Sequence, residues 1–171
     1  DAVNHVVINE VCGGSVELSA DDAIILPDFI ELYNAGYLNC DMKGLYLSDS
    51  TDEKRLLQVE NITLAPGERL LVELVDTELS VGRGGGETIY LYTESGRCID
   101  SVQLKEMSAG ISYGRAEDGS EEWALIRETP GRENKESDMV VNAPVFSNEA
   151  GFYDEEFYLT LSCDEGDRIY Y

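Results

Sequence analysis

The chain has 171 residues, 43% of them apolar, and it carries 35 Asp and Glu side chains against 12 Lys and Arg, for a formal net charge of −23. This charge excludes nucleic acid and anionic membrane surfaces as expected partners, because both are bound through Lys and Arg. The apolar content is sufficient for a packed core and excludes a disordered acidic chain.

Short segments rich in Val, Ile, Leu and Tyr alternate with turn residues, which is the pattern of β-strands. Because no segment has a sustained helical period, the sequence predicts an all-β fold, an antiparallel sandwich of two sheets. The expected strands are, in chain order, HVVINEVC (5–12), DFIELYN (28–34), GLYLSDS (44–50), RLLVELV (69–75), TIYLYT (88–93), CIDSVQL (98–104) and EEWALIR (121–127).

The first expected strand begins at His5, the only histidine of the chain. A Ser-His-Asp site would need His5 as its base, and no G-x-S-x-G motif accompanies it. We therefore expect His5 to be a surface residue.

The four cysteines show no C-x-x-C spacing, which argues against a zinc site. The sequence is compatible with one or two disulfides and with free buried thiols at Cys12, Cys40, Cys98 and Cys163.

The stretch LPDFIELYNAG (26–36) carries two carboxylates three positions apart, Asp28 and Glu31. Side chains alternate along a strand, so Glu31 shares a face with Phe29 and Tyr33 while Asp28 points to the other face. A glycosidase needs both carboxyl groups on one side of the sugar, roughly 5–10 Å apart. Asp28 and Glu31 are therefore not expected to form a catalytic pair.

A catalytic partner for Glu31 would have to come from another strand, for instance Glu10 in the segment INEV. A hydrolase that uses Glu10 and Glu31 is the least favoured hypothesis, because no histidine lies near either carboxylate. The favoured alternative is that Glu31 is a partly buried acid held by an arginine such as Arg115 or by backbone N–H groups. We expect no catalytic residues.

Two acidic loops, SDSTDE (48–53) and CDEGD (163–167), offer several oxygens to a calcium ion. Neither follows the EF-hand pattern, since the sixth position counted from Asp49 is Lys54 in place of glycine. Loop calcium in another geometry stays a hypothesis without assigned ligands. The glycine run VGRGGGETIYLY (81–92) matches no phosphate-binding pattern and precedes a strand, so a hairpin loop is expected and no other cofactor.

The segment RETPGRENKESD (127–138) lacks apolar periodicity and is expected to be a linker. The predicted organisation is a sandwich domain at 1–135, then a linker and an incomplete second β-module at 136–171. Strands are expected at 158–162 and 168–171. We expect this tail to pack on the sandwich or to pair with the edge strand of another copy, which would give a homo-oligomer through the C-terminal strands.

The order of the segments VVINEVCGGS, DFIELYNAG, MKGLYLSDS, LAPGERLLV, GGGETIYLYTESGRCIDSVQL, GISYGRAEDGSEEWALI and TPGREN resembles the lamin tail domain of secreted bacterial proteins. The resemblance covers residues 3 to about 135 and implies an immunoglobulin-like β-sandwich with a non-catalytic binding or tethering role. The tail from residue 143 is similar to the start of the β-module attached to chitobiases and β-hexosaminidases. Together they resemble the amino-terminal part of bacterial spore-coat-protein-H-like surface proteins.

The resemblance implies a module of a secreted or cell-surface bacterial protein that attaches to a protein or a cell-envelope glycan. The alternative is an accessory domain that positions a kinase-like catalytic domain downstream. A chain that begins at Asp1 without Met fits an extracellular location after removal of a targeting segment, and equally a trimmed fragment. No apolar run approaches the roughly 20 residues that cross a bilayer, so no membrane insertion is expected.

A glycan partner would need exposed aromatic rings, because ring faces stack on the C–H surfaces of sugars. The favoured alternative is that these rings pack in the core and across neighbouring strands. The candidate rings are Tyr37, Tyr46, Tyr90, Tyr92 and Tyr113.

Overall fold

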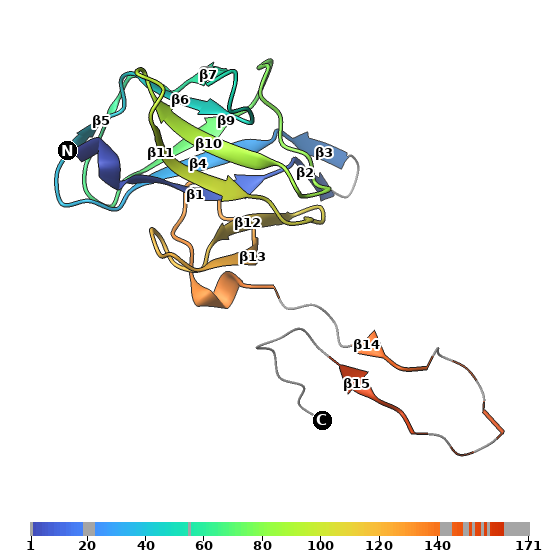
Figure 1. Cartoon of the computed structure of the whole chain (residues 1–171). Coiled ribbons are helices and arrows are strands. Elements are labelled where there is room, and N and C mark those ends of the chain that lie inside the picture. The colour runs from blue at the N-terminus through green and yellow to red at the C-terminus, as the bar shows by residue number, and fades with distance from the viewer. Residues whose placement is uncertain are drawn as a thin grey trace. The chain divides into compact units, whose positions relative to one another are not determined.

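The computed structural model describes residues 2–18, 23–54, 56–140, 145–148, 151, 153–154, 156 and 158–162. The chain divides into two compact units, Asp1–Met139 and Val140–Tyr171 (Figure 1). The described residues include two short 3-10 helices, η1 (Ala2–His5) and η2 (Glu136–Asp138). Within this described part, none of the helices is long and apolar enough to cross a membrane.

Two antiparallel sheets form the first unit, as the strand pattern predicts. The five-stranded sheet has the order β13 (Trp123–Arg127), β12 (Ile111–Arg115), β1 (Val6–Cys12), β4 (Phe29–Asn34) and β9 (Arg69–Glu73). The four-stranded sheet has the order β11 (Cys98–Gln103), β10 (Thr88–Thr93), β6 (Leu45–Ser48) and β7 (Leu57–Gln58). Two small hairpins accompany them, β2 (Ser15–Leu18) with β3 (Ala23–Leu26), and β5 (Cys40–Asp41) with β8 (Thr63–Leu64).

The hydrophobic core lies between the two larger sheets, which stack on each other in Figure 1. Alternate residues of each strand face it, because successive side chains of a strand point to opposite sides. Each such buried aliphatic side chain contributes about 1.5–3 kcal/mol through removal from water. Fully buried examples are Ile30 and Leu32 of β4, Leu45 and Leu47 of β6, and Ile89 and Leu91 of β10.

The predicted turns lie where the strands end. Gly67 follows β8 and Gly96 follows β10, and both have a φ of +79°, a conformation that glycine adopts without the steric cost of a Cβ. The Gly96 N–H donates to the Thr93 carbonyl over 2.8 Å and closes the turn between β10 and β11. Glycine thus completes the turns Ala65-Pro66-Gly67 and Glu94-Ser95-Gly96.

The prediction that residues 127–138 form a linker is wrong. Arg127 belongs to β13, and Thr129 and Asn134 are 0% and 1% exposed. Met139 forms an antiparallel bridge with Ile126, so the chain remains attached to the sheet to the end of this unit. The composition of the segment is that of a loop, but its polar groups find buried partners on the five-stranded sheet. Residues 128–134 are named the capping segment below.

The second unit contains one short antiparallel hairpin, β14 (Val145–Phe146) with β15 (Leu161–Ser162). β15 lies within the strand expected at 158–162. Tyr158 is 98% exposed, so this hairpin buries little apolar surface by itself. The strand expected at 168–171 and the acidic loop at 163–167 fall outside the described residues.

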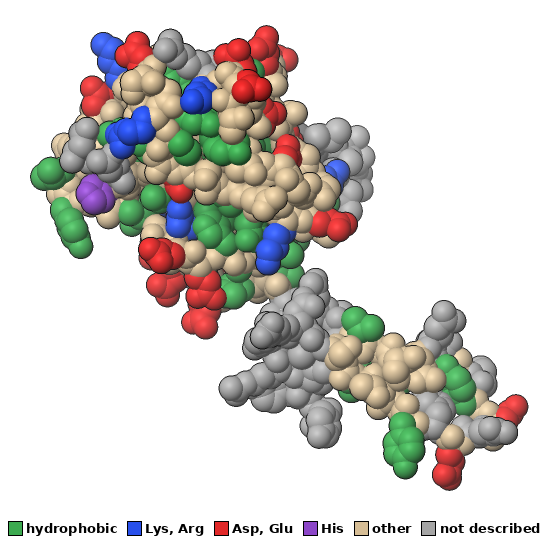
Figure 2. All heavy atoms as spheres, in the orientation of Figure 1, with side chains coloured by type: hydrophobic (Ala, Val, Ile, Leu, Met, Phe, Trp, Pro, Cys, Tyr) green, Lys and Arg blue, Asp and Glu red, His purple; other side chains and the backbone are tan. Residues whose placement is uncertain are grey.

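Acidic side chains occur at several separate places on the surface drawn in Figure 2, with basic side chains among them. This distribution matches the spread of Asp and Glu along the sequence. The net charge of −23 therefore acts on the molecule as a whole and is not confined to one tail.

Candidate functional site

A β-bulge in β1 determines which carboxylates meet. Ile8 and Val11 both lie in the core although they are three positions apart, which a regular strand with a period of two would forbid. The register between β1 and β4 shifts between Ile8 and Glu10, and the bulge takes up the extra residue, Asn9. Glu10 thereby reaches the outer face of the five-stranded sheet, opposite the core.

Glu10 and Glu31 are direct partners across β1 and β4, and both are 0% exposed. Glu31 shares its outward-facing position with Tyr33 and Phe29, as the alternation predicts. Asp28 is separate from this pair: its carboxylate accepts a hydrogen bond from the Val81 N–H over 2.9 Å. The structure thus brings together the two glutamates of the hydrolase hypothesis but buries both completely.

The side chain of Glu10 contacts three groups of the surrounding elements. One carboxyl oxygen, Oε1, accepts hydrogen bonds from the Ser112 hydroxyl (2.6 Å) and the Thr129 N–H (2.8 Å). The other, Oε2, lies 2.7 Å from the Thr129 hydroxyl, which also lies 2.7 Å from Oδ1 of Asn134. A hydroxyl has a single proton, so it cannot donate to both oxygens.

A protonated Glu10 resolves this geometry, since its Oε2–H can donate to Thr129 while Thr129 donates to Asn134. The orientation of the Asn134 amide is fixed because its Nδ2 donates to the carbonyl oxygens of Arg115 (2.9 Å) and Asn9 (3.3 Å). Burial raises the pKa of Glu10 above its ordinary value, against the smaller opposing effect of the hydrogen bonds from Ser112 and Thr129. The geometry and the direction of the pKa agree on a neutral acid.

Glu31 has a different environment, which contains donors only. Its Oε2 accepts a hydrogen bond from the Gly131 N–H over 2.8 Å, and its Oε1 accepts one from Nδ2 of Asn9 over 3.2 Å. Nε of Arg69 lies 3.8 Å from Oε1. Burial raises the pKa of Glu31 to about 7, while the hydrogen bonds from Asn9 and Gly131 and the nearby Arg69 oppose the rise.

The expected arginine near Glu31 is Arg69 and not Arg115, and the alternative of a backbone N–H group is confirmed at Gly131. Arg115 instead links the two sheets. Its Nε donates to the Ile8 carbonyl (2.8 Å), its NH2 group pairs with Asp100 of β11 (3.0 Å), and its NH1 group contacts the Ser120 carbonyl. It thereby satisfies a backbone group beside the bulge of β1.

The capping segment closes the outer side of this acid pair. Thr129 and Asn134 occupy its two ends, and Gly131 has a φ of +70°, which turns its N–H toward Glu31. Gly114 of β12 lies opposite Glu10, and a Cβ there would approach Asn134 to 3.2 Å and Ile126 to 2.6 Å. The absence of a side chain at position 114 therefore lets the capping segment lie close to the sheet.

The five tyrosines considered as a glycan-binding surface do not lie together in the structure. Tyr46, Tyr90 and Tyr92 lie together on β6 and β10, where the rings of Tyr90 and Tyr92 stack with centroids 5.6 Å apart. Tyr92 is 3% exposed, with Lys54 over its ring, so it cannot receive a sugar without rearrangement. Tyr113 is a core residue. Tyr37 is 95% exposed in the loop after β4, away from that cluster in the sequence.

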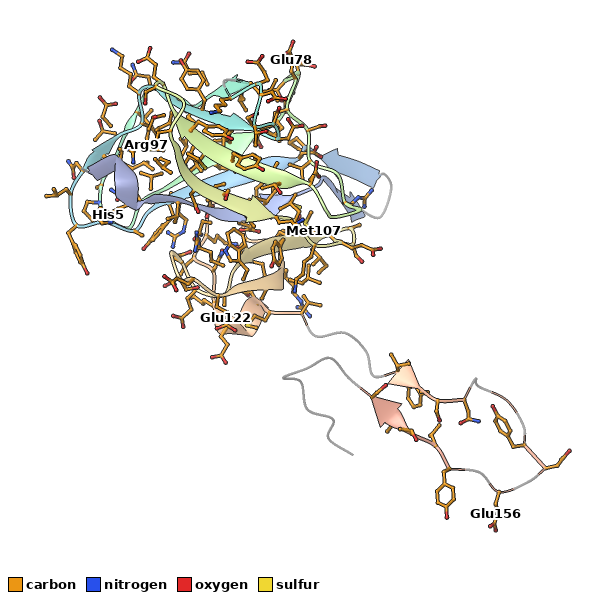
Figure 3. All side chains as sticks on the ribbon, viewed as in Figure 1. His5, Glu78, Arg97, Met107, Glu122 and Glu156 are labelled. Atoms are coloured by element: carbon orange, nitrogen blue, oxygen red, sulfur yellow. The ribbon has the colours of Figure 1, made fainter. Side chains whose placement is uncertain are left out.

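The histidine, the cysteines and the acidic loop at 48–53 do not form a common site in the structure. His5 lies exposed at the end of η1 (Figure 3). Cys12, Cys40 and Cys98 are free thiols, and Cys163 falls outside the described residues. In the loop at 48–53, the Ser48 hydroxyl donates to the Glu53 carbonyl over 2.5 Å and the serines hold the loop itself. Among described residues, no cluster of three or more His, Cys, Asp or Glu side chains has metal-binding geometry.

An edge strand carries two hollows that sequence patterns did not reveal. β9 is the outermost strand of the five-stranded sheet. One hollow lies on its outer face and is lined by Pro27, Phe29, Leu71, Glu73, Glu128 and Pro130. The other opens between β9 and β7 and is lined by Gln58, Glu60, Leu70, Leu71, Val72 and Glu73. Both hollows share Leu71 and Glu73, so they flank the same piece of backbone.

Comparison with known proteins gives one family. The family model described as Lamin Tail Domain matches residues 1–106, more than half of the chain. Its immunoglobulin-like β-sandwich agrees with the sheets described above and confirms the predicted fold class. No curated protein and no solved structure matches.

Proposed function

Since the chain belongs to the lamin tail domain family, we propose that it is a non-catalytic module that attaches a larger protein to a polypeptide partner. The observation that carries this proposal is the pair of open hollows along β9, which flank unpaired strand backbone. Strand edges of this kind bind extended peptides in other domains by adding a strand to the sheet.

The burial of the two glutamates supports a non-catalytic role. A general acid or nucleophile must reach its substrate within hydrogen-bonding distance. Glu10 and Glu31 are 0% exposed beneath the capping segment, and the described groups around them already occupy their oxygens. These contacts fit the structural role that the sequence favours for Glu31.

We also propose the kind of protein to which this chain belongs and its location. The resemblance of the tail to the chitobiase-type module, and of the whole to spore-coat-protein-H-like surface proteins, supports a secreted or cell-surface bacterial protein. The alternative is an accessory domain that positions a kinase-like catalytic domain. Pairing of C-terminal strands between copies and calcium in the loop at 48–53 or 163–167 remain subordinate hypotheses within this setting.

A cell-envelope glycan is the second candidate partner. It is favoured by the stacked rings of Tyr90 and Tyr92 on the outer face of β10. The low exposure of Tyr92 argues against a ready platform, so the polypeptide partner ranks first.

The test is to probe the whole chain against a displayed library of random peptides and against a glycan array. We expect peptide binding with dissociation constants that isothermal titration can measure, and no glycan retained. Glycan retention that a Tyr90→Ala variant abolishes would replace the first candidate with the second. A hydrolase screen in which turnover disappears in Glu10→Gln or Glu31→Gln variants would overturn the non-catalytic proposal.

A further inference from the structure

The free edge of β9 has a defined hydrogen-bonding pattern. The Asn34 N–H donates to the Glu68 carbonyl, and the Leu74 N–H donates to the Asp28 carbonyl. Hydrogen-bonded pairs alternate along an antiparallel ladder, so Leu70 and Val72 direct their backbone groups toward β4. The N–H and C=O groups of the residue between them, Leu71, therefore point away from the sheet.

The same alternation gives Arg69 and Glu73 outward-pointing backbone groups at the two ends of the strand. Among the described strands, none pairs with β9 on the side to which the N–H and C=O groups of Leu71 point. β9 thus presents the backbone pattern that an additional antiparallel strand requires.

The two hollows lie where the side chains of an added strand would fall. Successive side chains of such a strand point to opposite faces, so alternate residues would enter the outer hollow and the hollow toward β7. Backbone pairing supplies affinity in this type of recognition, and the pockets for alternate side chains supply specificity.

The chemistry of the hollows defines the occupant. Pro27, Phe29 and Pro130 make the outer hollow apolar, which suits an aliphatic or aromatic side chain. Exposed Glu60 and Glu73 line the hollow toward β7, and no Lys or Arg lines either hollow. Together with the net charge of −23, these glutamates favour Lys or Arg at the alternate positions of the occupant.

We propose that β9 binds an extended basic segment of a partner protein, which adds as a sixth strand with apolar and basic side chains in alternation. This inference rests on the proposed function and names its site and ligand class. A second copy of the chain is the less suitable occupant, since two molecules of charge −23 repel each other.

The experiment uses the full chain and library-selected peptides. A Leu71→Pro variant removes the outward N–H without removing a hydrogen bond of the sheet, since proline is accepted on the free side of edge strands. The matched control is Gln103→Pro on β11, an edge strand of the other sheet. The Leu104 N–H donates to Glu87, so the same alternation turns the Gln103 N–H outward.

We expect Leu71→Pro to weaken peptide binding at least tenfold in titration calorimetry, and Gln103→Pro to change it less than twofold. Hydrogen exchange should show the Leu71 amide of the unmodified chain protected when peptide is bound. In a second comparison, Glu73→Lys should weaken the binding of a basic peptide several-fold at low salt. Glu122→Lys, the same charge change at the exposed β12–β13 turn (Figure 3), should have a smaller effect.

Three outcomes are distinguishable. If no peptide binds, the proposed function fails. If peptides bind equally to the Leu71→Pro and Gln103→Pro variants and leave the Leu71 amide unprotected, the function stands but the β9 site is wrong. If the chain dimerises without peptide in sedimentation and Leu71→Pro abolishes the dimer, β9 pairs with a second copy, and the basic partner is wrong.

Discussion

At the scale of single residues, two glutamates of equal burial are held in opposite ways. Protonated Glu10 can donate a hydrogen bond to the Thr129 hydroxyl, which in turn donates to Asn134, whereas the partners of Glu31 only donate. Two like charges side by side in a buried site are costly, and neutralising one of them relieves that cost. The pair therefore accommodates one negative charge better than two.

A Glu10→Gln substitution tests the neutral state of Glu10. The amide of glutamine can donate to Thr129 and accept from Ser112, as the protonated acid does. We expect the free energy of unfolding at pH 7 to change by less than about 1 kcal/mol in urea titration. Glu10→Leu should cost roughly 2–4 kcal/mol, because it leaves buried donors without a partner. Equal losses in the two variants would contradict a neutral Glu10.

Glu31 should make stability depend on pH. Its pKa in the folded chain, about 7, lies above the ordinary value of 4.5, so the folded state binds the proton more tightly than the unfolded state. Its contribution is present below pH 4.5 and is lost as the pH rises through 7. We expect the free energy of unfolding to fall by about 3 kcal/mol over this window through Glu31 alone.

The measurement compares urea unfolding of the unmodified chain and of a Glu31→Gln variant from pH 4.5 to 8. Other carboxylates titrate in both proteins, so the quantity of interest is the difference between the two slopes. Glutamine at position 31 directs an N–H toward one existing donor, as the protonated acid directs its O–H, so the two proteins should have similar stability at acid pH and differ as the pH rises. Parallel pH curves for the two proteins would refute the raised pKa.

At the scale of elements, the capping segment covers the outer face of the five-stranded sheet and supplies hydrogen bonds to the two glutamates buried there. Its contacts come from positions about 100 or more residues away, such as Thr129 with Glu10 and Gly131 with Glu31. These bonds replace water that the carboxylates lose on burial. A segment with the composition of a linker is therefore part of the folded domain.

A pair of fragments tests this role. Residues 1–139 contain the capping segment and η2, whereas residues 1–127 end with β13. We expect the shorter fragment to lose at least about 3 kcal/mol of unfolding free energy, because it loses the buried hydrogen bonds that Thr129, Gly131 and Asn134 make to the sheet. A fragment of residues 1–106, the span of the family match, also lacks β12 and β13 and should not fold. Circular dichroism and urea titration distinguish these results.

The strands with regular apolar alternation could be predicted, and the elements that depend on distant partners could not. β12 was missed because Ser112 and Gly114 interrupt its pattern, and both residues are explained only by Glu10 and the capping segment. The regular alternation of side chains along a strand does not predict the bulge at Asn9. The meeting of Glu10 and Glu31 was anticipated as a hypothesis, but their burial follows from residues 128–134, which composition marks as a loop.

At the scale of the whole molecule, the net charge of −23 opposes compact folding through mutual repulsion. Salt screens such repulsion over distances of about 10 Å at 0.1 M. We expect the melting temperature at pH 7.5 to rise by roughly 3–8 °C between 20 and 300 mM NaCl. The same titration at pH 4, where many carboxylates are protonated, is the control and should show a smaller rise. An equal rise at both pH values would contradict the explanation.

The capping segment has a consequence for how the chain is made. A ribosome releases residues in order, and Glu10 and Glu31 emerge about 100 residues before Thr129 and Gly131. Until then Thr129 and Gly131 cannot cover Glu10 and Glu31, so we expect both side chains to be hydrated. We therefore expect the first unit to close only after its last dozen residues, 128–139, have left the ribosome.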